Sequence, residues 1–548
     1  MPAGSDNMVS PLEPYNLFTT DPVLANAIER EGGGRGADHD LLVEFGERVG
    51  SDEVFEWGHL ANRHSPELVT HDRNGNRVDE VEFHPAYHSL MELSVSAGIH
   101  CMRYEREPGD GGYVTRNALM YLISQVEVGH CCPTSMTGAV MPALRHQPDL
   151  AEVWGPRLVS RSYDPRLIVP DQKTGSLMGM GLTEKQGGSD VRANTSTAAP
   201  VNGGGPGGEH RLTGHKWFTS APMSDAFLTL AQAPKGLSCF LVPRILPDGS
   251  RNSLHFQRLK DKLGNRSNAS GELEYTDAAG WMVGEEGRGV PTIIEMVNGT
   301  RIDCTNWSAA MMRQAVAQAA WHVSHRTAFG ANLIDKPLMR NVLADLELEA
   351  EAATLMTARI SGAYDRSAID PDEAALARLG TGVAKYWLTK RAAPVVREAL
   401  ECVGGNGYVE ESILPRLYRE VPLNAIWEGA GNVIALDVLR AMARSPQSTD
   451  VFLAELGRAQ GADPILDAAV ARLRSTIVEL DTAEANARRL VEQMAMCWAA
   501  ALLVQHGDSA ASDAYVRSRL GGDWGSELGT LPPDAALEAI ARRALPVP

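Results

Sequence analysis

Residues 180–191 read Met-Gly-Leu-Thr-Glu-Lys-Gln-Gly-Gly-Ser-Asp-Val, and the character of the chain changes at this stretch. Gly187 and Gly188 have no side chains, so backbone N–H groups beside them can come close to a phosphate or a flat ring. Thr183 and Ser189 add hydroxyl donors that carry no charge. A glycine-rich turn is also typical of an ordinary β turn, so a binding role needs support from the surrounding sequence.

The residues that follow this stretch favour strands as far as about Gly287. The β-favouring runs are residues 211–219, 226–231, 237–242 and 272–275. Residues 202–208, just before the first run, read Asn-Gly-Gly-Gly-Pro-Gly-Gly and lack the Lys-Ser/Thr and the following helix of a phosphate-binding loop. We therefore expect a hairpin loop at 202–208 inside a small β domain.

Helical periodicity dominates the chain on both sides of the β region. It covers residues 118–128 and, after Pro291, residues 302–329, 337–364, 372–403, 425–443 and 464–506. A Ser-Pro-Gln-Ser break at 445–448 precedes the last of these segments. We expect a mainly α protein with a central β domain. Its expected parts are a helical N-terminal domain (1–175), a β domain (176–290), a four-helix bundle (291–444) and an appended C-terminal helical domain (445–548).

Charge and composition exclude several classes of protein. The net charge of -18 argues against a generally basic nucleic-acid-binding surface, although a local basic patch is compatible with it. The first residues lack the basic start and apolar core of a signal peptide, and the longest apolar run, 494–504, is too short to span a bilayer, so we expect a cytoplasmic protein. The seven cysteines form no C-x-x-C pair, and adjacent residues such as His130, Cys131 and Cys132 do not converge on one point. We expect reduced thiols and no metal site.

Residues 425–432, Ala-Ile-Trp-Glu-Gly-Ala-Gly-Asn, place one carboxylate between apolar residues on one side and small residues on the other. Burial against an aromatic ring would disfavour the charged form of Glu428 and raise its pKa toward the range in which a general base works best. Proton abstraction is the obvious use of such a group. The alternative is a surface glutamate that begins a helix and stabilises its first turn through the helix dipole.

A helical domain, a small β domain and a helical bundle, in this order, resemble the acyl-CoA dehydrogenase family, and residues 180–191 resemble its flavin-binding signature. The resemblance implies FAD as cofactor and a β barrel as the central domain. Trp217-Phe218-Thr219 resembles the second flavin segment, in which the tryptophan packs on the isoalloxazine ring and the threonine bonds near its N5 edge. A tryptophan in a strand is otherwise more often part of the core. The residues implied to contact flavin here are Met180, Leu182, Thr183, Gly188, Ser189, Trp217, Phe218 and Thr219.

Two further segments resemble the parts of the family that reach the adenosine side of FAD. Residues 322–330 resemble the end of the first bundle helix, whose arginine contacts the pyrophosphate bound by a neighbouring subunit, and residues 404–408 resemble the loop that completes this contact. The arginine could instead be a helix-end residue favoured by the dipole, and the glycines a helix cap. The implied cofactor-binding residues are Arg326, Phe329, Gly404, Gly405, Asn406 and Gly407, together with Trp427, Gly429 and Asn432 around Glu428.

Glu428 falls where most acyl-CoA dehydrogenases carry their catalytic glutamate. The implied reaction is α,β-dehydrogenation of an acyl-CoA thioester: Glu428 removes the α-proton, a hydride leaves the β-carbon for flavin N5, and the backbone N–H of Glu428 polarises the carbonyl. Ser189 and Arg301 are implied to lie near the substrate, and a cation at Arg301 would keep Glu428 more ionised. The reaction requires no metal.

The resemblance is closer still to the adaptive-response flavoproteins, a branch of the isovaleryl-CoA dehydrogenase-like enzymes. The segments that carry it are residues 183–191, 258–270 and 415–420. Lys185 and Gly187 stand where mainstream dehydrogenases have proline and alanine, and Ala430 where they have threonine, which counts against ordinary β-oxidation. The branch implies a homotetramer, an electron acceptor such as electron-transfer flavoprotein, and weak dehydrogenase turnover. The alternative function it implies is a DNA-associated flavoprotein that protects against alkylation damage.

Duplex DNA would be bound through the C-terminal domain, since phosphates must be neutralised by several Lys or Arg side chains. The candidate residues are Arg472, Arg474, Arg488, Arg489, Arg517, Arg519, Arg542 and Arg543. Within residues 441–548 acidic side chains outnumber arginines and lysine is absent. A solvated helical face with ion pairs four residues apart is therefore the alternative interpretation.

Overall fold

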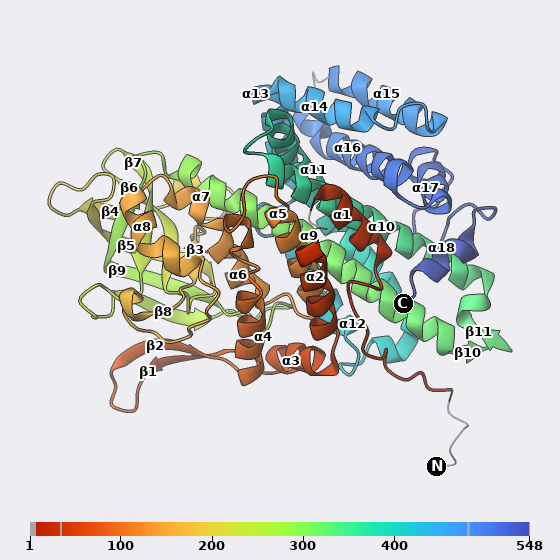
Figure 1. Cartoon of the computed structure of the whole chain (residues 1–548). Helices are drawn as coiled ribbons and strands as arrows, with labels where there is room; N and C mark the ends of the chain where they lie inside the picture. The colour runs from red at the N-terminus through yellow and green to blue at the C-terminus, as the bar shows by residue number, and fades with distance from the viewer. Residues whose placement is uncertain (1–6, 33–35, 479–482, 547–548) are drawn as a thin grey trace, which may run out of the picture. The chain divides into compact units, whose positions relative to one another are not determined.

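The computed structural model describes residues 7–32, 36–478 and 483–546. The chain forms two compact units, each assembled from segments that are distant in the sequence (Figure 1). The first unit contains residues 1–52, 106–126 and 301–548, and the second contains residues 53–105 and 127–300. Among the described helices, none has both the length and the apolar character that crossing a bilayer requires.

The second unit is built around a small closed β barrel, which confirms the expected central β domain (Figure 1). Strands of the described chain pair in the order β6–β4–β5–β9–β7, and β7 pairs with β6 to close the ring. The barrel strands are β4 (Thr197–Pro200), β5 (Glu209–Ser220), β6 (Ala226–Ala233), β7 (Gly236–Pro243) and β9 (Ser270–Val283). Side chains that alternate along these strands form its core, including Leu212, Phe227, Phe240, Leu273 and Met282.

The glycine-rich residues 202–208 join β4 to β5, which pair antiparallel, so the hairpin-loop prediction is confirmed. Asn202 and the first three glycines of the loop have positive φ angles, a conformation that glycine adopts without steric cost. Two other strands flank the barrel: β3 (Met178–Gly181) pairs parallel with β6, and β8 (Leu254–Leu259) pairs antiparallel with β9.

A second hairpin in this unit lies in the region for which the sequence predicts a helical domain. It consists of β1 (Glu67–His71) and β2 (Arg77–Glu82). Its turn is closed by Asp72, whose carboxylate accepts hydrogen bonds from the backbone of Asn74 and Asn76. The helices of the unit are α3 (Asp52–Arg63), α4 (Pro85–Ser96), α6 (Cys131–Ala139), α7 (Met141–Leu144) and α8 (Pro148–Leu158).

The first unit is a bundle of long helices, and most residues of α10 are buried in it (Figure 1). Its main helices are α9 (Gly289–His325), α10 (Pro337–Arg366), α11 (Pro371–Val403), α12 (Leu414–Asn424) and α13 (Gly431–Arg444). Of α9, only the part from residue 301 onward belongs to this unit. The N-terminal helices packed with them are α1 (Pro22–Glu31), α2 (Gly36–Val49) and α5 (Gly112–Ser124). The C-terminal helices are α14 (Pro446–Gly457), α15 (Pro464–Val478), α16 (Ala483–His506), α17 (Ser509–Tyr515) and α18 (Leu537–Arg543).

Several helix boundaries differ from the sequence prediction: the helix expected over 118–128 spans Gly112–Ser124, and the one expected over 302–329 begins at Gly289. The helix expected over 302–329 ends at His325 and is followed by a short hairpin of β10 (Thr327–Ala328) and β11 (Ala331–Asn332). The helix expected to begin at residue 425 begins at Gly431. It starts late because Glu428 and Gly429 have φ angles of 56° and 111°, which a right-handed helix excludes.

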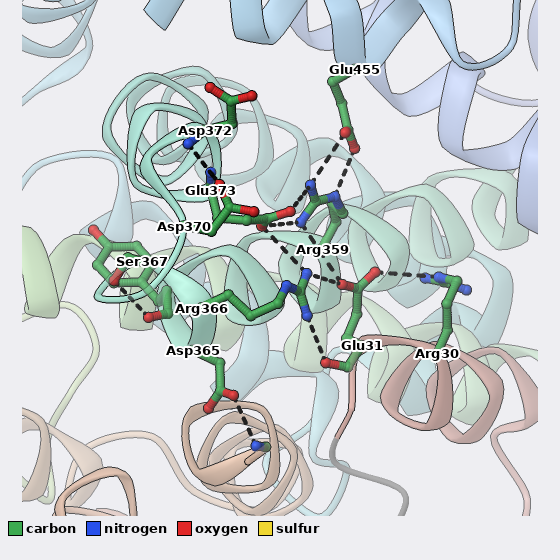
Figure 2. Close-up of polar contacts among 12 residues, drawn as sticks. Arg30, Glu31, Arg359, Asp365, Arg366, Ser367, Asp370, Asp372, Glu373 and Glu455 are labelled. Atoms are coloured by element: carbon green, nitrogen blue, oxygen red, sulfur yellow. Dashed lines mark hydrogen bonds and ion pairs between the residues drawn. The ribbon is translucent and has the colours of Figure 1, made fainter. Parts of the chain in front are cut away.

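A buried ionic cluster joins four helices of this unit (Figure 2). Arg359 on α10 donates to Glu373 on α11 at 2.8 Å and to Glu455 on α14 at 2.7 Å. Arg366 donates to Glu31 on α1 at 3.0 Å and also to Glu373. The cluster fixes the first of the C-terminal helices to the bundle, because a buried carboxylate is stable there only while it is paired.

Candidate functional site

The stretch 180–191 leaves β3 and folds back against β5. The N–H of Trp217 donates to the carbonyl of Thr183 at 2.7 Å, and Thr183 and Phe218 form a β bridge. A Cβ atom at Gly188 would lie 2.6 Å from the Thr183 hydroxyl oxygen, so the turn has no room for a larger residue. The two segments predicted to contact flavin are therefore adjacent in the structure.

The side chains at this place offer two aromatic rings, with a lysine ammonium over them, beside a buried hydroxyl. Trp217 is half-buried, Phe218 is 51% exposed, and the ammonium of Lys260 lies 3.5 Å from the centroid of the indole ring. The Thr219 hydroxyl is buried and has no hydrogen-bond partner among the residues that the structure describes. Such an arrangement fits a flat ligand with a hydrogen-bond acceptor at its edge, as the isoalloxazine ring of FAD has.

The other residues that are predicted to contact flavin differ in their exposure to solvent. Met180, Leu182 and Thr183 are half-buried, whereas Gly188 and Ser189 are exposed.

A buried ion pair that is not predicted from the sequence supports the flavin segment. Lys216 donates to Glu184 at 2.8 Å and to the carbonyl of Leu230 at 2.8 Å. Glu184 also accepts from the backbone N–H of Thr195 at 2.6 Å. Burial alone would raise the pKa of Glu184, but the charge and hydrogen bonds of Lys216 outweigh it and lower the pKa to about 2. The alternation of β5 places Lys216 on the same buried face as Leu212, and this was the signal for an inward lysine.

Glu428 lies in the turn between α12 and α13 and is half-buried. Its φ of 56° is a left-handed conformation that costs a non-glycine residue about 1–2 kcal/mol. The turn precedes α13, which begins at Gly431. Glu428 therefore precedes the first turn of α13 and is not part of it.

Two cations from neighbouring helices hold the backbone of this turn. Lys385 on α11 donates to the carbonyl of Trp427 at 2.9 Å and to that of Gly429 at 2.6 Å. Arg301 on α9 donates through Nε to the carbonyl of Glu428 at 2.9 Å and pairs with Asp437 at 2.8 Å. Arg301 is among the residues predicted from the sequence, whereas Lys385 is not. Its only sequence signal is a lysine among buried apolar positions of a helix.

The side chain of Trp427 contacts other side chains beside the turn. Its ring lies 5.6 Å from that of the buried Trp307, and its Nε1 donates to the side chain of Asn424 at 3.1 Å. Asn432 is exposed in the first turn of α13.

The residues predicted for the adenosine side of FAD lie at two surface features of the first unit. Arg326 follows the last residue of α9 and donates to the carbonyl of Asn7, while Phe329 occupies the tip of the β10–β11 hairpin and is 93% exposed. Gly404, Gly405, Asn406 and Gly407 form a single 3-10 turn after α11. Gly404 caps that helix with a φ of 69°, which confirms the helix-cap interpretation.

The C-terminal arginines are mostly engaged within the protein. Arg519 is buried and pairs with Asp345 and with Glu349 on α10, so its prediction as a DNA contact is wrong: binding a phosphate would break two buried ion pairs. Arg517, Arg542 and Arg543 pair with Asp534, Glu538 and Glu351 at 2.7, 3.0 and 2.6 Å, respectively. The exposed members of the predicted set are Arg472, Arg474, Arg488, Arg489 and Arg542.

Three family models match consecutive parts of the chain. Residues 7–165 match the adaptive response protein AidB N-terminal domain. Residues 179–278 match the acyl-CoA dehydrogenase middle domain, and residues 287–443 match the acyl-CoA dehydrogenase C-terminal domain.

Solved structures share this fold. The crystal structure of Caenorhabditis elegans ACDH-11 in complex with C11-CoA has a TM-score of 0.84 and 28% identity, and the match covers 95% of this chain and 93% of that one. An acyl-CoA dehydrogenase complexed with FAD from Bacillus anthracis has a TM-score of 0.69, and the match covers 93% of this chain and 88% of that one. At 15% identity the second likeness shows the fold alone.

Curated relatives match along nearly the whole length. The chain is 44% identical to the putative acyl-CoA dehydrogenase AidB of Escherichia coli (strain K12), and the match covers 94% of each protein. It is 30% identical to acyl-CoA dehydrogenase family member 11 of C. elegans, over 92% of this chain and 86% of that protein. The chain thus belongs to the acyl-CoA dehydrogenase family, among its AidB-like members.

Proposed function

We propose that the protein is an FAD-dependent dehydrogenase that forms a double bond between the α- and β-carbons of an acyl-CoA thioester, with Glu428 as the base. The observation that carries this proposal is the turn at Glu428, a carboxylate on a left-handed backbone that two buried cations hold in place. Backbone strain of this kind is concentrated at active sites, because it persists only where many surrounding contacts fix the conformation. Family membership supports the oxidoreductase class and FAD as the cofactor.

The flavin segment supplies the residues that would hold the cofactor. When bound, FAD accepts the hydride that leaves the β-carbon. The unpartnered hydroxyl of Thr219 would donate to the edge of its ring, and the indole of Trp217 would shield one side of it from water. Thr183 and Ser189 would add uncharged donors, and Gly188 allows the backbone to approach closely.

Glu428 has two roles in the proposed reaction. Its carboxylate takes the α-proton of the thioester, and its backbone N–H donates to the thioester carbonyl, where negative charge develops as the proton leaves. Arg301 fixes the turn from the side of the Glu428 carbonyl, and Ser189 and Arg301 are proposed to lie near the substrate. C11-CoA is the first thioester to test, because the similar ACDH-11 structure is a complex with it.

An anaerobic titration of the purified yellow protein with a panel of acyl-CoA thioesters tests the proposal. At least one thioester should bleach the flavin absorbance. Glu428→Gln should slow this reduction by about 10²–10⁴-fold while the FAD content stays unchanged, since it removes only the proton acceptor. The matched control is Glu411→Gln, the same change at an exposed glutamate. Equal reduction rates in Glu428→Gln and the wild-type protein would remove the base assignment.

The proposal includes an assembly and an electron acceptor. Arg326, Phe329 and residues 404–407 would contact FAD bound by a second copy of the chain, within a homotetramer. The exposure of Phe329 and of residues 404–406 on the first unit supports this role. Electron-transfer flavoprotein is the proposed acceptor for reoxidation.

A second candidate function is favoured by the match of residues 7–165 to the adaptive response protein AidB N-terminal domain. According to this alternative, the protein is a flavoprotein that associates with duplex DNA and protects it from alkylation, with little dehydrogenase turnover. A small flavin response to every thioester in the panel would favour this candidate over the first.

A further inference from the structure

Three consecutive carbonyl groups of the Glu428 turn each accept a hydrogen bond from a buried cation. Lys385, which is 1% exposed, donates to the first and third, those of Trp427 and Gly429. Arg301, which is 6% exposed, donates to the second, that of Glu428 itself. Side chains on α9 and α11 thus hold the backbone of the proposed base by hydrogen bonds.

The placement of Lys385 has a direct effect on the backbone N–H of Glu428. The carbonyl of Trp427 and the N–H of Glu428 belong to one peptide unit, which is planar and trans, so the two bonds point in opposite directions. An ammonium fixed 2.9 Å from the carbonyl oxygen therefore fixes the direction of the N–H on the other side. It also draws electron density toward the oxygen, which makes the N–H a stronger donor.

A buried ammonium is costly unless hydrogen bonds compensate for the lost water, and two peptide carbonyls supply that compensation here. If Lys385 served only to fill space, an apolar side chain of the same length could replace it at little cost in stability. Lys390, on the same helix, is only half-buried, and its ammonium lies 5.4 Å from the centroid of the Tyr386 ring.

Building on the proposed function, we infer that Lys385 is a positioning residue. It acts through the Trp427–Glu428 peptide to aim and strengthen the Glu428 N–H as the donor to the thioester carbonyl of bound acyl-CoA. Arg301 complements it by fixing the next peptide, which keeps Glu428 in its left-handed conformation.

The charge of Lys385 is sensitive to mildly alkaline pH. Burial lowers the pKa of its ammonium to about 8, and the nearby cations Arg301 and Lys390 act in the same direction. Cys304 on α9 and Glu428 in the turn oppose the change. Loss of this proton leaves a neutral amine, which polarises the peptide less than an ammonium does.

The carbonyl stretch of a bound thioester reports the strength of this donor. The probe is an acyl-CoA with carbon-13 at its carbonyl and sulfur in place of its β-carbon, so that it binds the FAD-loaded protein but cannot transfer hydride. Isotope-edited infrared difference spectra should show the carbonyl band of the bound probe below that of the free probe. In Lys385→Met the band should move back toward the free value, and in Lys390→Met it should stay at the wild-type position.

Kinetics give a second readout. Removing one such donor outright costs about 10²–10³ in kcat, so a misdirected N–H in Lys385→Met should lower the rate of flavin reduction by about ten- to a hundred-fold. The acyl-CoA concentration at half-saturation should change little, because the donor acts mainly on the charge that develops during the reaction.

The wild-type protein supplies a test that does not depend on how well Lys385→Met folds. On raising the pH through about 8 the carbonyl band of the bound probe should rise, and Lys385→Arg, which stays protonated, should lack this step. An unchanged band both in Lys385→Met and across this pH range would overturn the inference while leaving the proposed function intact. A wild-type protein whose flavin no acyl-CoA bleaches, and which does not shift the band, would overturn both.

Discussion

The ammonium of Lys216 lies 2.8 Å from Glu184 Oε1, and neither side chain is exposed to solvent. Glu184 belongs to the stretch 180–191 and Lys216 to β5, directly before Trp217. The pair therefore connects the two segments that are proposed to hold the flavin. Because both ions have lost their water, each depends on the other for compensation.

Removing one member of this pair should be strongly destabilising. Lys216→Met leaves a buried carboxylate without its counter-ion, and we expect the free energy of unfolding to fall by about 3–5 kcal/mol. The double variant Lys216→Met/Glu184→Gln should recover part of this loss, because it leaves no unpaired charge. Urea unfolding curves of both variants, with the FAD content of each, measure the effect. A single variant as stable as the wild-type protein would show that the pair contributes nothing to stability.

The same pair predicts a stability change in acid. In the folded protein the pKa of Glu184 is lowered to about 2 from its ordinary value of 4.5. Its contribution to stability is therefore complete above about pH 4.5 and is lost as the pH falls toward 2.

The measurement compares the free energies of unfolding of the wild-type protein and Glu184→Gln across this range. The difference between the two should be largest above about pH 4.5 and should shrink as the pH falls toward 2. A constant difference would contradict the lowered pKa.

The sequence predicts the layers of this fold because they follow from local periodicity. The alternation of the barrel strands and the apolar faces of α10 and α11 are visible in neighbouring residues, and glycine marks the loop at 202–208. The sequence prediction extends the helix through the turn at Glu428, because the left-handed backbone there depends on cations that lie elsewhere in the chain.

The supporting groups of the candidate site are harder to predict for the same reason. Lys216 meets Glu184, and Lys385 meets the carbonyl of Trp427, only once distant segments pack together. Arg519 illustrates the opposite error: in the sequence it is a cation in an acidic region, and in the fold it is the partner of Asp345. The numbers of acidic and basic residues do not tell a buried pair from an exposed one.

The second candidate function makes a prediction about the exposed arginines. If duplex DNA binds the C-terminal helices, Arg488→Glu/Arg489→Glu should weaken binding and reduce the slope of log affinity against log salt by about 0.9 for each phosphate that is no longer neutralised. The control Arg378→Glu/Arg440→Glu alters the net charge equally at exposed arginines outside those helices. Electrophoretic shift or anisotropy at several salt concentrations measures the slope. A wild-type protein that binds no duplex at low salt excludes this function.

The β10–β11 hairpin predicts a contact with a second copy of the chain. Its tip is formed by Phe329 and Gly330, both with positive φ, and Phe329 is 93% exposed although its ring is apolar. A strained turn that presents an aromatic ring to water is unfavourable in an isolated chain, and it becomes favourable when the ring enters another surface.

Phe329→Ser should therefore shift the oligomer toward smaller species and lower the FAD content, since the hairpin is proposed to contact flavin held by its neighbour. Leu338→Ser is the control, because Leu338 is 84% exposed on the same unit but lies on α10, outside the hairpin. Sedimentation velocity of the FAD-loaded proteins, with the ratio of flavin to protein absorbance, measures both effects. If Phe329→Ser assembles and retains FAD as fully as Leu338→Ser, the hairpin has no role between copies and Phe329 is not a cofactor contact.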